Sequence, residues 1–119
     1  MNQSKEMVTI ACKALEEKKG EDIRIIDISN ISVLADYFII ANGTNDSQIR
    51  AMVDEVEDSL LKAGYPVKQR EGYGLGNWVL LDFQDIIVHV FDKENRLFYD
   101  LERIWCDGKE IMLEDILTT

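Results

Sequence analysis

The sequence is poor in the residues that build metal sites and disulfide frameworks. It has one histidine, His89, and two cysteines, Cys12 and Cys106, which lie far apart and form no C-x-x-C pair. A structural zinc site needs four closely spaced cysteine or histidine ligands, so we expect no site of this kind. Two unrelated cysteines are typical of reduced thiols in a cytosolic protein.

The chain also has a single proline, no low-complexity segment and no apolar run long enough to cross a membrane. Its first residues include an acid and resemble neither a hydrophobic leader nor an arginine-rich transit peptide, so we expect no secretory or organellar signal. The sequence therefore predicts a cytoplasmic protein that makes no membrane contact. With 119 residues and no linker, it predicts one domain over residues 1–106 and a C-terminal tail over residues 107–119.

Positive charge is the minority. Lysine and arginine number 13 against 23 acids, so the net charge is −10. A surface of this sign repels phosphate backbones, so we expect little or no direct binding to nucleic acid. It would instead attract a basic protein. The alternative interpretation is that the acidity only keeps a small domain soluble.

Hydrophobic periodicity predicts an α+β domain with a mixed sheet, in the order α-β-β-α-β-β-β-α. The first expected helix ends at Gly20 and buries Met7, Val8, Ala11, Ala14 and Leu15. The second is capped by Asn45 with Gln48, ends at Gly64 and buries Ile49, Met52, Val53, Val56 and Leu60. The third covers residues 96–105 after a cap at Asp92. The expected strands are 23–28, 37–41, 67–71 at an edge, and a hairpin of 78–82 with 86–91. The tail segment 109–117 either folds back on the sheet or docks on a partner.

The segment 96–105 concentrates aromatic residues and acids in under three helical turns. Leu97, Leu101 and Ile104 share one helix face, flanked by Phe98 and Trp105. The remaining side chains, which point to solvent or to a partner, are Tyr99, Asp100, Glu102 and Arg103. Exposed aromatics beside acids are typical of a recognition surface rather than of a catalytic site.

Two glycine segments are candidates for a phosphate site. The segment 72–76 lacks the G-x-G-x-x-G spacing and precedes a strand, so a simple connection is favoured. Gly43-Thr44 lies between a strand and a helix, as in nucleotidyltransferases, and is the better candidate. Those enzymes also need paired carboxylates on the next strand, and the segment 67–71 has no Asp-x-Asp. Transferase activity would require Asp82 and Asp85 to hold the metal instead.

The other candidates have plain structural interpretations. Asp82 and Asp85 bracket a hairpin turn, where aspartate is common for turn geometry alone. His89 lies in an apolar strand and is predicted to be buried rather than a catalytic base. Trp78 is either a core anchor or an exposed binding residue. We therefore expect no enzyme activity, no cofactor and no metal.

Three motifs together resemble the ribosomal silencing factors, the Iojap-related family. They are Asp27-Ile-Ser-x-x-Ser32-x-x-Ala-Asp36-Tyr-Phe-Ile-Ile-Ala-x-Gly43, Trp78-Val-Leu-Leu-Asp82-Phe-x-Asp85-Ile-Ile-Val-His89-Val-Phe91 and Arg96-x-Phe-Tyr99-x-Leu-Glu102-Arg-x-Trp105. The resemblance runs in order from about Lys5 to Trp105 and leaves the tail uncovered.

The resemblance implies a nucleotidyltransferase-like fold without the catalytic carboxylates. It implies a translational repressor that binds the large ribosomal subunit through the ribosomal protein numbered fourteen and blocks joining of the small subunit when nutrients fall. Family members are often homodimers when free. The same surface would also suit a large-subunit assembly factor.

Carried over residue by residue, the family's binding surface falls on Trp78, Tyr99, Asp100 and Glu102, with Leu101 and Trp105 as packing support. The physical interpretation agrees, because a basic ribosomal protein would meet aromatics at the centre and acids at the rim.

Overall fold

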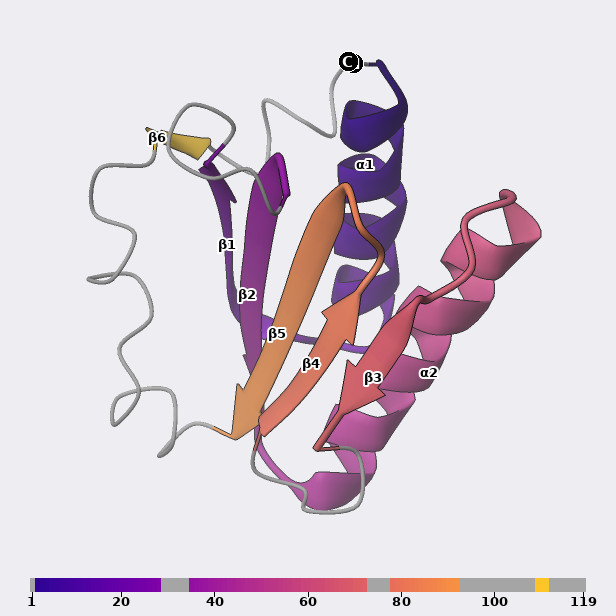
Figure 1. The fold of residues 1–119 in the computed structure, drawn as a ribbon. Coiled ribbons are helices and arrows are strands. Elements are labelled where there is room, and N and C mark those ends of the chain that lie inside the picture. The colour runs from indigo at the N-terminus through magenta and orange to yellow at the C-terminus, as the bar shows by residue number, and fades with distance from the viewer. Residues whose placement is uncertain (1, 29–34, 73–77, 93–108, 112–119) are drawn as a thin grey trace.

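A computed structural model of the chain describes residues 2–28, 35–72, 78–92 and 109–111, with the backbone alone at residues 2, 78 and 109–111. Its elements are α1 (Asn2–Glu17), β1 (Glu21–Asp27), β2 (Tyr37–Gly43), α2 (Asp46–Lys62), β3 (Gln69–Glu71), β4 (Trp78–Asp82), β5 (Ile86–Asp92) and β6 (Lys109–Ile111) (Figure 1). The helix expected over 96–105 lies outside the described residues.

The described strands form a mixed sheet in the order β3-β4-β5-β2-β1-β6. The central pair, β2 and β5, is parallel, with Ile39 opposite Val88. All other neighbouring strands are antiparallel, including the predicted hairpin of β4 and β5. A sheet of this kind with two helices packed on it confirms the predicted α+β class.

Both described helices cover the same face of the sheet (Figure 1). Their apolar residues are buried at the predicted positions, from Met7 to Leu15 in α1 and from Ile49 to Leu60 in α2. They pack on alternate residues of the strands, such as Ile39, Val79 and Val88. Each large side chain buried in this way contributes about 1.5–3 kcal/mol relative to an exposed one, so this layer holds the domain together.

The opposite face of the sheet carries a second buried cluster. It comprises Ile26, Ile28, Ala35, Phe38, Ile40 and Phe91. As a result β2 is buried at every residue, which confirms the prediction of a strand that is apolar on both faces.

The predicted ends of the helices are also confirmed. Asn45 caps α2, because its Oδ1 accepts a hydrogen bond of 2.8 Å from the backbone N–H of Gln48. Gly64, after the end of α2, has φ of +98°, a conformation that favours glycine. At Gly20 a Cβ would lie only 2.8 Å from Cε of Met52, so the chain passes closely under α2 there.

Several segments differ in detail from the sequence-based prediction. β1 spans Glu21–Asp27 rather than residues 23–28, and β2 continues to Gly43 rather than ending at residue 41. The edge strand starts at Gln69 rather than at residue 67, and the first backbone bond to β4 comes from Lys68, whose N–H donates to the carbonyl of Asp82 at 2.8 Å. In the tail, residues 109–111 fold back and pair with β1, Ile111 opposite Ile25. Of the two interpretations of the tail, the sheet-pairing one holds for these residues.

Candidate partner-binding surface

Trp78 is the one predicted binding residue whose backbone the structure describes. It opens β4 and pairs with Phe91 of β5. Along β4 the alternate residues Val79 and Leu81 lie in the core under the helices. The alternation of a strand therefore assigns position 78 to the other face of the sheet, which the described helices do not cover. Sequence alone could not choose between the two faces, because that choice depends on the pairing with β5.

The other predicted contacts, Tyr99, Asp100, Leu101, Glu102 and Trp105, lie outside the described residues and remain predictions. Their segment follows in sequence from β5, whose last residue is Asp92. Since Phe91 is paired with Trp78, the chain leaves β5 beside the start of β4.

His89 is confirmed as a core residue. Its side chain is 3% exposed and lies between two rings, with ring centroids 4.7 Å from Phe38 and 6.1 Å from Phe91. Burial lowers the pKa of this imidazole to about 4. At neutral pH it is therefore uncharged and shielded from solvent, which does not suit a general base for a bound substrate.

The phosphate candidate at Gly43-Thr44 is filled by the protein's own side chain. Oε1 of Gln48 accepts hydrogen bonds from the N–H of Thr44 at 2.6 Å and from its hydroxyl at 2.8 Å. At Gly43 an added Cβ would lie 2.9 Å from the side chain of Ile49. An anion at this helix end would have to displace Gln48 from Thr44, so the geometry disfavours a phosphate site.

Asp82 and Asp85 have structural roles at the β4–β5 turn. Oδ1 of Asp82 accepts from the N–H of Gln84 at 2.8 Å, which supports the positive φ of 79° at that residue. The Asp85 carboxylate accepts from the side chain of Gln3 at 3.3 Å. Among the described residues, no group of three or more histidine, cysteine and acidic side chains could hold a metal ion.

Cys12 is a buried core thiol. Desolvation, with a smaller contribution from Glu16, raises its pKa to about 12. The thiolate is the reactive form of cysteine, so this residue is inert at neutral pH. Cys106 lies outside the described residues.

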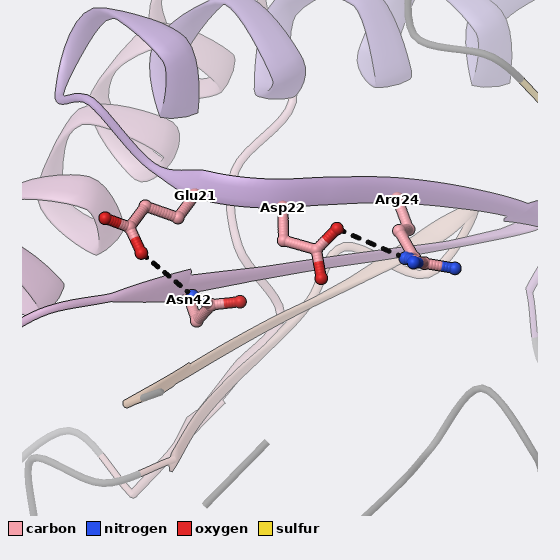
Figure 2. Close-up of polar contacts among 4 residues, drawn as sticks. All are labelled: Glu21, Asp22, Arg24 and Asn42. Carbon is pink, nitrogen blue, oxygen red and sulfur yellow. Dashed lines mark hydrogen bonds and ion pairs between the residues drawn. The ribbon is translucent and has the colours of Figure 1, made fainter. Parts of the chain in front are cut away.

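A polar group at the start of β1 was not expected from the sequence. Arg24 donates to Asp22 at 3.3 Å, and Asn42, which is 4% exposed, donates to Glu21 at 3.5 Å. Figure 2 shows how these four side chains lie. A shift in the β1–β2 register between Glu21 and Arg24 accompanies the positive φ of Asp22. The only available signal was the pair of acids at the start of a strand.

A groove between α2 and β3 is a further feature that sequence reasoning missed. Its lining includes Asp54, Leu61 and Pro66.

None of the helices in the described part of the chain has the length and apolar character to span a membrane.

Comparison with known proteins gives one consistent family. The sequence matches the family described as "Ribosomal silencing factor during starvation" (RsfS) over residues 1–119, which includes the tail that the motif resemblance left uncovered. The ribosomal silencing factor RsfS of Bacillus subtilis is 43% identical over 108 residues, which is 91% of this chain and 91% of that protein.

A solved structure and a more distant relative extend this result. The crystal structure of a protein from Chromobacterium violaceum superposes with a TM-score of 0.82 at 37% identity and covers 84% of this chain and 83% of that one. A mouse protein named "Mitochondrial assembly of ribosomal large subunit protein 1" is 29% identical over 94 residues, 76% of this chain and 41% of the mouse protein.

Proposed function

The chain belongs to the RsfS family of ribosomal silencing factors, and from this premise we propose that it represses translation by binding the large ribosomal subunit and blocking its union with the small subunit. The observation that carries the proposal is the family match over residues 1–119. The names of its relatives indicate a ribosome-associated regulatory factor rather than an enzyme.

The proposed mechanism is occlusion. A domain bound at the face of the large subunit that meets the small subunit occupies space that an intersubunit bridge needs, and no covalent bond is made or broken. The proposed partner is the basic ribosomal protein numbered fourteen, and the proposed setting is the cytoplasm of a starved or stationary-phase cell. The net charge of −10 supports a basic partner, because opposite charge speeds encounter and suppresses wrong partners.

The proposed contact surface combines Trp78 with Tyr99, Asp100 and Glu102, while Leu101 and Trp105 support it by packing. The β4–β5 register supports the inclusion of Trp78, because it puts the start of β4 beside the end of β5, from which the chain continues in sequence toward residue 99. Aromatic side chains at the centre of such a surface would supply most of the binding energy, and the acids would act at its rim. Free in solution, we expect the protein to form a homodimer.

Sedimentation of isolated ribosomal subunits mixed with the protein tests the proposal. We expect the protein to migrate with the large subunit and the fraction of joined ribosomes to fall as its concentration rises. Absence of the protein from the large-subunit peak would overturn the proposal.

A second candidate is a factor for assembly of the large subunit. It is favoured by the name of the mouse relative, whose 94 matched residues cover 76% of this chain. Silencing predicts that loss of the protein changes the fraction of joined ribosomes when growth stops. Assembly predicts that precursors of the large subunit accumulate during growth, and gradient profiles from both phases separate the two.

A further inference from the structure

A groove of about 360 Å³ opens at the edge of the sheet, between α2 and the segment that leads into β3. One wall is a single face of α2, with Asp54, Glu57, Asp58 and Leu61 at helical spacing, and the other wall is formed by Pro66, Val67 and Arg70. Arg70 pairs with Leu81, whose side chain lies in the core under the helices. The groove therefore lies on the helix side of the sheet, the side opposite to that assigned to Trp78.

One end of the groove is apolar. Leu61 is 58% exposed, and it is the large hydrophobic residue left exposed among those the structure describes. Beside it, Pro66 is exposed and Val67 packs partly against the main core. A single exposed leucine is ordinary, but one that lines a concave surface with two further apolar residues offers a site for an apolar side chain.

The rest of the groove is acidic. Asp54 and Asp58 are exposed, and Glu57 holds Arg70 through two bonds of 2.8 and 3.1 Å. Asp58 pairs with Lys62 at 2.9 Å, but these side chains are 54% and 77% exposed. An exposed pair of this kind contributes little, so an incoming cation can replace Lys62 at small cost. With Lys62 counted, three carboxylates face two cations, Arg70 and Lys62, and the remaining net negative charge favours a positively charged ligand.

The backbone beside the groove suits an extended ligand. Within the described residues, β3 is the outermost strand and pairs with β4. An edge strand accepts an added strand from another chain, with main-chain bonds for affinity and side-chain pockets for specificity.

We propose that this groove binds an extended basic peptide segment of a partner protein. An apolar residue of the segment packs on Leu61, Pro66 and Val67, and a lysine or arginine on either side of it reaches Asp54 and Asp58. The inference is independent of the proposed function, because the groove lies on the opposite side of the sheet from the surface that contains Trp78.

The test uses two peptides of equal charge and the intact protein. The probe is the acetylated heptapeptide Lys-Val-Lys-Leu-Lys-Val-Lys with a fluorescent label, and its control replaces valine and leucine by serine. Binding is measured by anisotropy at about 0.15 M salt, where attraction between exposed charges is screened beyond about 8 Å. Competition with unlabelled probe excludes binding through the label.

Three variants locate the binding. Asp54→Asn/Asp58→Asn removes two charges from the groove, Glu16→Gln/Glu17→Gln removes two exposed charges from α1, and Leu61→Ser removes the apolar contact. Circular dichroism melting confirms that each variant folds.

We expect the groove double variant and Leu61→Ser each to weaken binding of the probe about fivefold, while the α1 variant leaves it within twofold. We also expect the serine peptide to bind at least fivefold more weakly than the probe. Equal weakening by both double variants would mean general attraction to an acidic protein and would overturn the proposal. Undetectable binding at millimolar peptide would overturn it as well.

Discussion

Ser4 and Asp36 are joined across the domain by a hydrogen bond of 2.7 Å from the serine hydroxyl to the carboxylate. Ser4 is 3% exposed in the first turns of α1, and Asp36 immediately precedes β2. The backbone of Asp36 continues the connection, because its N–H donates to the carbonyl of Asp85 and its carbonyl accepts from Ile28. One short segment therefore fixes the start of α1, the start of β2 and the β4–β5 turn relative to one another.

Ser4→Ala should lower the free energy of unfolding by about 1–2 kcal/mol. The change removes a hydrogen bond to an ionised group and leaves a half-buried carboxylate without that donor. Urea unfolding followed by circular dichroism measures the difference. The matched control is Thr9→Ala, since the hydroxyl of Thr9 donates only to the carbonyl of Lys5 within the same helix. If the two variants lose equal stability, the bond to Asp36 has no special role.

Gln48→Ala should cost about 2 kcal/mol of stability, more than a helix cap alone. Besides accepting from Thr44, its Nε2 donates to the carbonyls of Lys18 and Lys19 at 3.1 and 2.8 Å, so it joins the start of α2 to the end of α1. Without these bonds, the backbone groups that Gln48 contacts must bond to water or lack a hydrogen-bond partner.

Gln48→Glu distinguishes the acceptor role of this side chain toward Thr44 from its donor role toward Lys18 and Lys19. Glutamate keeps the acceptor for Thr44 but places a negative charge against two carbonyl oxygens, so we expect it to recover little of the loss. Urea midpoints of the wild type and both variants measure this, and a glutamate variant as stable as the wild type would show that the bonds to Lys18 and Lys19 contribute nothing.

Local patterns predicted the parts of the fold that depend on near neighbours in sequence. The continuous apolar run of residues 37–41 predicted a strand buried on both faces, and the spacing of Asn45 and Gln48 predicted the start of α2. The second use of Gln48 was not predictable, since its partners lie 29 and 30 residues earlier and only the packing of the helices brings them together.

The candidate site shows the same division. The buried state of His89 followed from its apolar strand, and the face assigned to Trp78 required the register with Phe91. The groove beside Leu61 was not foreseen, because its shape depends on how the segment that leads into β3 folds back along α2, which local periodicity does not show.

His89 should make stability depend on pH below about 6.5. Burial lowers its folded-state pKa to about 4, whereas in the unfolded chain it stays near 6.5. The unfolded state therefore binds the proton first, and stability that is complete above pH 6.5 is lost as pH falls toward 4. Between pH 7 and pH 5 the loss is about 2 kcal/mol.

Chemical unfolding of the wild type and of His89→Leu at several pH values isolates this effect, because the carboxylates titrate in both proteins. We expect the wild type to lose more stability than the variant over the same interval. Parallel curves would mean that the imidazole is not desolvated in the folded protein.

Trp78→Ala and Tyr99→Ala should each weaken binding to the large ribosomal subunit by about 2 kcal/mol, close to thirtyfold, if these aromatics are the centre of the proposed surface. Binding of labelled protein to purified subunits measures the change, with Glu17→Gln as an exposed control on α1. Because Trp78 lies opposite Phe91 in the sheet, unfolding curves of each variant must first show that the fold is kept. Wild-type affinity in a folded Trp78→Ala/Tyr99→Ala double variant would move the contact surface elsewhere on the domain.

The acids at the rim should respond differently to salt. Glu102→Gln should weaken binding more at low salt than at high salt, because exposed charge pairs separated by more than about 10 Å are largely screened at 0.1 M.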